Sequence, residues 1–280
     1  MDIIELNQFP SVAANARATL VTDELLDTSV HALIFEMGGT FTKAQMTNIR
    51  IRHGGKDLVQ GISGDQMQDL NDYDGLPDVT NYLVYFFGDP TARTARGEHM
   101  GDLDLSIYRE PLEIEVDIGG ATNPTLQMWA IKGVPKMDMG IGFSAQEAAH
   151  FRTLIRTQIQ PAAAVTNKSY GISLGGNAGG RLRKVGFFHA NLTKVELKKA
   201  GFTKVDDITV ALNSAIAQQY ARVPQSGLFV LDRIVDGNQG SAETTADPDG
   251  KPWNMRLSLT TSAGDTINAF ADMHVARAML

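Results

Sequence analysis

Short runs of alternating apolar and polar residues, separated by Gly, Asn, Asp and Pro, constrain this chain more than any other feature. In residues 112–118, four aliphatic side chains alternate with Glu113, Glu115 and Asp117. Successive side chains of a β-strand point to opposite faces of a sheet, so this pattern predicts a strand with one buried and one wet face. Similar runs predict strands over 18–22, 31–37, 46–53, 82–87, 112–118 and 125–131, and then over 185–199, 208–212, 228–234, 255–259 and 267–274.

Between these two sets of strands the pattern changes to that of a helix. Ser144 and Glu147 have the spacing of a capping box, in which each residue satisfies a backbone N–H of the other at a helix start. Apolar residues then recur at helical spacing: Ala148, Phe151, Ile155 and Ile159. Pro161 ends the pattern, so the sequence predicts a helix over 144–160.

A repeated tripeptide suggests that the β-rich halves are related. Phe41-Thr42-Lys43 precedes one predicted strand and Phe202-Thr203-Lys204 precedes another, and a short helix is predicted after each, over 65–71 and 214–221. This order favours an all-β chain made of a duplicated antiparallel β-sandwich with short helices. We expect an N-terminal domain over 1–133, a connector over 134–168 and a C-terminal domain over 169–280.

Composition excludes several kinds of function. The 280 residues include no cysteine, which excludes disulfide scaffolds, thiolate metal sites and cysteine nucleophiles. The formal net charge is −7, which gives no overall attraction to nucleic acid. No segment has the roughly 18 consecutive apolar residues of a membrane-spanning helix. Packing must hold the fold together.

Two glycine motifs resemble those of enzymes but lack the required context. Gly171–Gly175 has the form of a nucleophile elbow around Ser173, yet no helix is predicted after it, and Asp207 and His274 complete a catalytic triad in order only. Residues 140–145 resemble a dinucleotide fingerprint but follow no strand and lack the later acidic residue. We interpret residues 140–145 as the flexible start of a capped helix.

Sites for ions and phosphates are equally unsupported. Residues 247–250 resemble a calcium loop, but Arg256 stands where a bidentate Glu is required, so they predict a turn. Residues 175–180 lack the Lys-Ser/Thr ending of a phosphate loop and are interpreted as a hinge. The six histidines show neither a His-x-His nor a His-Glu-x-x-His spacing: His31, His53, His99, His150, His189 and His274.

Two predicted strands carry charged residues at a period of two. Glu113, Glu115 and Asp117 lie on one strand face, and Arg50 and Arg52 lie on another. Charges at a period of two are typical of a solvated or subunit-contacting sheet face rather than of catalytic carboxylates. The sequence thus assigns no catalytic residue, no cofactor site and no metal ligand, and it favours a structural or interaction protein.

Three segments resemble a known family. Residues 6–15, Leu-Asn-Gln-Phe-Pro-Ser-Val-Ala-Ala-Asn, resemble the start of the major capsid protein of corticoviruses, which are tailless icosahedral bacteriophages with an internal membrane. Residues 47–51, Thr-Asn-Ile-Arg-Ile, resemble a strand of that family, and residues 197–201, Leu-Lys-Lys-Ala-Gly, resemble the end of a strand in its second half. The resemblance is best over the first 70 residues.

The resemblance implies a fold and a function. It implies two eight-stranded jelly rolls in tandem, standing upright in the shell, and homotrimers of pseudo-hexagonal outline that contact neighbouring capsomers. It implies a capsid location in the virion after synthesis in the host cytoplasm, with penton and membrane-associated virion proteins as further partners. Membrane contact would be indirect, since no basic amphipathic helix is predicted, and no direct contact with nucleic acid is expected.

Two other functions remain open at this point. One is a β-sandwich binding module, such as a virion spike or a carbohydrate-binding protein, because sandwiches of this kind serve many functions. The other is a hydrolase that uses Ser173, which requires a nucleophile elbow that the sequence does not support.

Overall fold

The structure, a computed structural model, describes residues 1–171, 180–247 and 249–276. The chain divides into two compact units. Unit 1 contains residues 1–71 and 76–153, and unit 2 contains residues 72–75 and 154–280. Each unit is a β-sandwich of antiparallel strands.

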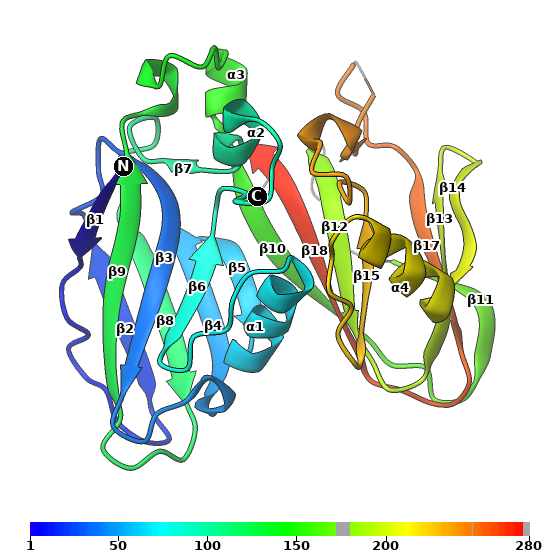
Figure 1. Cartoon of the computed structure of the whole chain (residues 1–280), viewed down its shortest axis with the longest axis horizontal. Coiled ribbons are helices and arrows are strands. Elements are labelled where there is room, and N and C mark those ends of the chain that lie inside the picture. Colours follow the sequence, from blue (N-terminus) through cyan, green and yellow to red (C-terminus); the bar gives the residue numbers. More distant parts are fainter. Residues whose placement is uncertain (172–179, 248, 277–280) are drawn as a thin grey trace. The chain divides into compact units, whose positions relative to one another are not determined.

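Unit 1 has two sheets. One has the strand order β1-β9-β3-β6, with the short β7 beside β3, and the other has the order β5-β4-β8-β2; Figure 1 shows the first set of strands in front of the second. The bounds in the first sheet are β1 Asp2–Glu5, β9 Thr125–Gly133, β3 Ser29–Gly38, β6 Tyr82–Phe86 and β7 Leu103–Asp104. The bounds in the second are β5 Lys56–Ile62, β4 Met46–His53, β8 Leu112–Ile118 and β2 Arg17–Thr22.

The core of unit 1 follows from the alternation seen in the sequence. Ile49 and Ile51 on β4 face Val116 and Ile114 on β8 in register, and all four are fully buried. The strands predicted over 46–53 and 112–118 are therefore confirmed at both ends. Burying each of these aliphatic side chains stabilises the folded state by about 1.5–3 kcal/mol relative to leaving it exposed.

Unit 2 also has two sheets. One has the order β15-β12-β18-β10, with β16 paired to β12, and the other has the order β11-β17-β13-β14. The bounds in the first are β15 Leu228–Asp232, β12 Arg181–Phe188, β18 Ile267–Ala276, β10 His150–Ile159 and β16 Glu243–Thr244. The bounds in the second are β11 Val165–Tyr170, β17 Met255–Thr261, β13 Leu192–Lys199 and β14 Phe202–Thr209. The first four residues of β10 are counted with unit 1.

Helices are short in both units. The α-helices are α1 Gly64–Tyr73, α2 Ala95–His99, α3 Ala145–Ala148 and α4 Val210–Gln219. The 3-10 helices are η1 Lys43–Gln45, η2 Lys136–Asp138 and η3 Gln239–Ser241. Within the described part of the chain, no helix has the length and apolar character needed to cross a membrane.

The helix predicted over 144–160 is wrong beyond Ala148. Ser144 and Glu147 do form the predicted capping box, but the helix that they cap has only four residues. Residues 150–159 form strand β10 instead. Phe151, Ile155 and Ile159 are four residues apart, a spacing that fits one face of a helix and equally one face of a strand. The β-branched Thr153 and Thr157 between them favour the strand.

Other boundaries also differ from the sequence prediction. The run over 185–199 is two strands, β12 and β13, joined by residues 189–191. The strand predicted over 208–212 ends at Thr209, whose hydroxyl accepts a hydrogen bond from the backbone N–H of Leu212 and so begins α4. The repeated tripeptides lie in different local structures, because Phe41 is buried before η1 whereas Phe202 is 74% exposed on β14.

Candidate functional site

The enzyme-like motifs do not form a site among the described residues. Ser173 and the rest of 172–179 lie outside the described part of the chain. The other two residues of the possible triad, Asp207 and His274, are on different sheets of unit 2. Asp207 is on β14 and accepts a hydrogen bond from Lys194, whereas His274 is buried on β18. Residues 140–145 lead into the capped helix α3, as predicted.

The calcium-like segment is a turn, as predicted. Asp247 accepts hydrogen bonds on its side chain from the backbone N–H groups of Asp249 and Lys251, and Gly250 has a φ of 80°. Pro248 lies outside the described residues. Arg256 is on β17, where Lys198 is its cross-strand partner.

The charged sheet face is a network of ion pairs rather than a catalytic site. Asp117 accepts hydrogen bonds from Arg17 Nε at 2.6 Å and Asn48 Nδ2 at 2.7 Å, and the hydrogen bond from Arg17 lowers the pKa of Asp117. Glu115 lies 3.6 Å from Arg50 and 3.4 Å from Arg52. Both acidic residues therefore already have cationic partners on neighbouring strands of unit 1.

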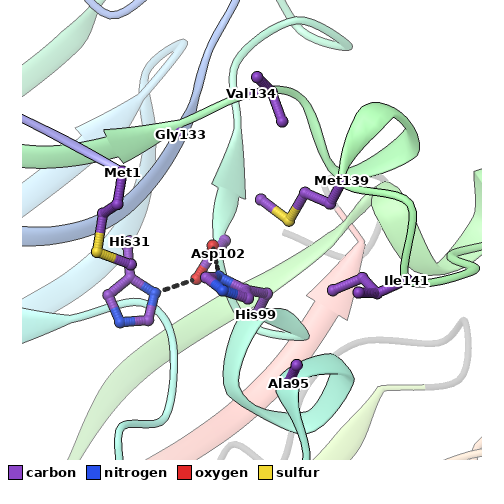
Figure 2. A pocket seen from close by; sticks show the side chains of 9 residues that line it. All are labelled: Met1, His31, Ala95, His99, Asp102, Gly133, Val134, Met139 and Ile141. Carbon is purple, nitrogen blue, oxygen red and sulfur yellow. Dashed lines mark hydrogen bonds and ion pairs between the residues drawn. The ribbon is translucent and has the colours of Figure 1, made fainter.

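Asp102 is shared by two histidines in unit 1. Each oxygen of its carboxylate accepts one hydrogen bond, from His31 Nδ1 at 2.9 Å and from His99 Nδ1 at 2.8 Å (Figure 2). The two imidazole centroids lie 5.1 Å apart. His31 comes from β3, His99 ends α2 and Asp102 follows it in the chain. The hydrogen bond to Asp102 raises the pKa of His99.

A buried lysine lies near this cluster. Lys136 Nζ donates to the backbone oxygens of Met100 at 2.8 Å and His150 at 2.6 Å. Its backbone N–H donates to the carboxylate of Asp104. Burial lowers the pKa of Lys136 to about 8, although the charges of Asp102 and Asp104 oppose the shift. The ammonium is therefore directed at main-chain carbonyls and not at the imidazoles.

The cluster opens on a small pocket of about 270 Å³. Figure 2 shows Val134, Met139 and Ile141 on the side of the pocket opposite to His31, and Met1 beside His31. The remaining lining residues are Met1, Ala95, Gly133, Val134, Met139 and Ile141. Side-chain exposure is 1% for Asp102 and 20% for His99, so the carboxylate is buried while one imidazole reaches the surface.

The histidine cluster could not be predicted from the sequence, because its members are distant in the chain. His31 precedes Asp102 by 71 residues, and the register of β3 in the sheet brings them together. The only local signal is the three-residue spacing of His99 and Asp102 at the end of α2. That spacing resembles no known metal motif by itself.

A second cluster of buried charges lies in unit 2. Asp74 forms ion pairs with Lys184 and, at 3.1 Å, with Arg222. Asp232 lies 3.9 Å from Lys184 and 3.6 Å from Arg222. Burial raises the pKa of Asp232, and burial also raises the pKa of Tyr73, whose hydroxyl contacts Asp232. Two acids and two cations balance each other here, which indicates a structural role.

Exposed apolar side chains gather on α4. Leu212, Ile216 and Tyr220 are spaced by four residues from the start of α4 to its C-terminal cap, and they are 54%, 40% and 47% exposed. Residues spaced by four lie on one face of a helix. Phe202 on β14 and Val223 beyond α4 are exposed too, at 74% and 49%. A contiguous exposed apolar stripe is typical of an interaction surface.

Comparison with known proteins places the chain in a family. The model of the viral coat protein P2 N-terminal domain matches residues 3–135, and that of the viral coat protein P2 C-terminal domain matches residues 151–274. No curated protein sequence matches the chain.

Solved structures show the same fold. The chain is similar to the major capsid protein P2 of bacteriophage PM2, with a TM-score of 0.82 and 18% identity over 100% of this chain and 99% of that one. It is also similar to the major capsid protein of Sulfolobus Turreted Icosahedral Virus, with a TM-score of 0.65 and 13% identity over 98% of this chain and 96% of that one. The PBCV-1 protein VP54 gives a TM-score of 0.61 and 11% identity over 99% and 95%.

These findings decide between the functions that the sequence left open. The two family models together cover most of the chain, and they describe a viral coat protein rather than a hydrolase or a carbohydrate-binding module. The two β-sandwich units are jelly rolls in tandem, as the resemblance implied. The chain therefore belongs to the viral coat protein P2 family and is a non-enzymatic major capsid protein of the virion.

Proposed function

We propose that this capsid protein assembles into homotrimers of pseudo-hexagonal outline, which tile an icosahedral shell around an internal membrane. The presence of two jelly-roll units in one chain is the observation that carries the proposal. Three chains bring six similar sandwiches together, which approximates sixfold symmetry with only three identical subunits. The connector expected over 134–168 contains β10 and β11, which belong to the sheets of unit 2, so we assign one jelly roll to unit 1 and the other to unit 2.

The apolar face of α4 supports the assignment of a subunit contact. Leu212, Ile216 and Tyr220 expose apolar surface that a neighbouring subunit would bury. Fully burying a side chain of this size stabilises by about 1.5–3 kcal/mol, so even a few such residues contribute much to association. We propose that this face packs against a neighbouring chain of the same trimer.

We further propose penton and membrane-associated virion proteins as partners of the assembled shell. In this proposal, contact with the membrane is indirect and runs through those membrane-associated proteins. The net charge of −7 supports the proposal that the genome is contacted by other components.

Light scattering coupled to size-exclusion chromatography tests the proposal. A homotrimer has a molar mass of three times 30.3 kDa. Electron microscopy of the same fraction should show particles of pseudo-hexagonal outline. A stable particle of 30.3 kDa at all accessible concentrations would contradict the trimer, and a trimer with three separate lobes would contradict the proposed outline.

A further inference from the structure

We propose that His31, His99 and Asp102 bind one transition-metal ion of the Zn²⁺ class. These residues are the one group among the described residues whose His and carboxylate ligand atoms all lie within 4.8 Å of one another. Two imidazole nitrogens and a carboxylate oxygen are a donor set that Zn²⁺ uses, with open positions left for water. The inference goes beyond the assembly proposed above and does not depend on it.

The distances are close to those that an ion requires. Bonds of about 2.0–2.2 Å to tetrahedral Zn²⁺ place neighbouring ligand atoms roughly 3.3 Å apart. Nδ1 of His31 and of His99 lie 2.9 and 2.8 Å from the two carboxylate oxygens of Asp102. The ion would displace the two Nδ1 protons, because a coordinating imidazole nitrogen must be deprotonated. All the ligand atoms lie within 4.8 Å of one another, so side-chain rotations are required to bring them to the roughly 3.3 Å spacing of ligands around Zn²⁺.

The surrounding backbone holds these side chains in place. His31 is on β3, which pairs with β6, β7 and β9. A Cβ at Gly88 would lie 2.2 Å from His31 Cε1 and 2.6 Å from Asp102 Oδ1, so only glycine allows both side chains to occupy their positions. A donor set that is fixed before binding requires little ordering when the ion arrives.

The nearby charges favour a cation. The charged groups that act on His99 and Lys136 are the carboxylates of Glu98, Asp102 and Asp104 and the ammonium of Lys136, so carboxylates outnumber ammonium groups around the cluster. Lys136 Nζ donates to the carbonyls of Met100 and His150, so its charge is not directed at the ligand atoms. A divalent cation thus enters a site of negative charge.

Access to the site is through the pocket of about 270 Å³. His31, His99 and Asp102 all line this pocket, and Figure 2 shows the thioethers of Met1 and Met139 near them. Thioethers favour Cu⁺ over Zn²⁺, so we expect water in the open positions of a bound Zn²⁺ ion. The ion would connect β3 to the segment that follows α2 and would stabilise unit 1 by binding the folded state alone.

The test uses the full chain, freed of metal with EDTA and then desalted. Isothermal titration with Zn²⁺ should give one ion per chain, and Zn²⁺ should raise the melting temperature. His99→Gln and Asp102→Asn should each weaken the affinity for Zn²⁺ by at least about 100-fold. Substituting a residue that only hydrogen-bonds to a metal ligand lowers metal affinity by about 10- to 100-fold, and loss of a ligand itself should cost at least as much. His189→Asn removes an imidazole from unit 2 and is the matched control, which should bind like the unchanged protein.

A second measurement does not depend on whether the variants fold. X-ray absorption of the Zn²⁺-loaded, unsubstituted protein should show two imidazole ligands per ion. Absence of stoichiometric binding would overturn the proposal, as would an oxygen-only ligand shell. Binding that survives unchanged in both His99→Gln and Asp102→Asn would also overturn it, because the ion would then be held elsewhere. Far-UV circular dichroism in EDTA establishes that each variant is folded.

Discussion

Arg183 and Asp272 form a two-pronged ion pair inside unit 2, with Arg183 Nη1 at 2.9 and 3.1 Å from the two carboxylate oxygens. The two side chains are only 1% and 5% exposed. The pair links the neighbouring strands β12 and β18, and Arg183 Nε also donates to Gln239. Charges this deeply buried are tolerated only while both remain paired.

Asp272→Asn should destabilise the protein strongly, because it leaves the Arg183 charge buried without its counter-charge. We expect the free energy of unfolding to fall by about 3–5 kcal/mol, measured by urea denaturation. Asp207→Asn is the control, since it breaks the exposed pair with Lys194, whose side chain is 41% exposed. That control should cost about 0–1 kcal/mol. Equal losses in the two variants would contradict the buried-pair interpretation.

Gly88→Ala should disturb the histidine cluster through steric overlap alone. The added methyl group would lie 2.2 Å from His31 Cε1, so His31 and Asp102 must shift. We expect a loss of about 1–3 kcal/mol in the free energy of unfolding, as for other overpacked buried sites. Gly120→Ala is the matched control, because nothing lies within 4 Å of a Cβ at that position. A neutral Gly88→Ala would show that the cluster is loosely packed.

Stability in acid should depend on Glu147. Hydrogen bonds from Ser144, first from its backbone, lower the pKa of Glu147 to about 2 from an ordinary value of 4.5. A carboxylate with a lowered pKa in the folded state contributes stability above its unfolded pKa, and this contribution is lost as the pH falls from about 4.5 to about 2. Melting temperatures across this range should therefore fall less in Glu147→Gln than in the unchanged protein. Ser144→Ala should reduce the slope similarly, and an unchanged slope in both variants would contradict the assignment.

Ile216→Asp should weaken assembly if the α4 face is a subunit contact. A carboxylate would replace one of the exposed apolar side chains in the centre of the stripe, and desolvating it in an interface is unfavourable. Light scattering should then show the molar mass falling towards 30.3 kDa. Gln218→Asp adds the same charge to an exposed position on the opposite face of the helix and should leave the mass unchanged. Full assembly of Ile216→Asp would place the contact elsewhere.

Local patterns were sufficient to predict much of the sheet structure. The alternation in β4 and β8 is a property of adjacent residues, so both strands could be predicted to their ends. Strand β10 could not, because Phe151, Ile155 and Ile159 repeat every four residues and fit both a helix and a strand. Pairing with neighbouring strands decides whether such a segment becomes a helix or a strand, and the sequence of the segment alone does not show that pairing.

The histidine cluster could not be predicted from the sequence for a similar reason. Neither His31 nor Asp102 carries a local signal, and the separation of 71 residues between them is closed only by the fold. The importance of Gly88 likewise appears only when the side chain that it lacks is placed against His31. Functional groups brought together by a sheet are thus harder to predict than the strands that carry them.

Arg17 lies on β2, the last strand in the order of its sheet in unit 1. Its guanidinium binds Asp117 on β8 and is thereby held over the sheet face. A long cationic side chain at the edge makes the strand a poor template for another chain to extend, because an added strand would have to accommodate the charge. For a protein whose copies must gather at one shell, a charged edge of this kind opposes the pairing of β2 with a strand of another copy.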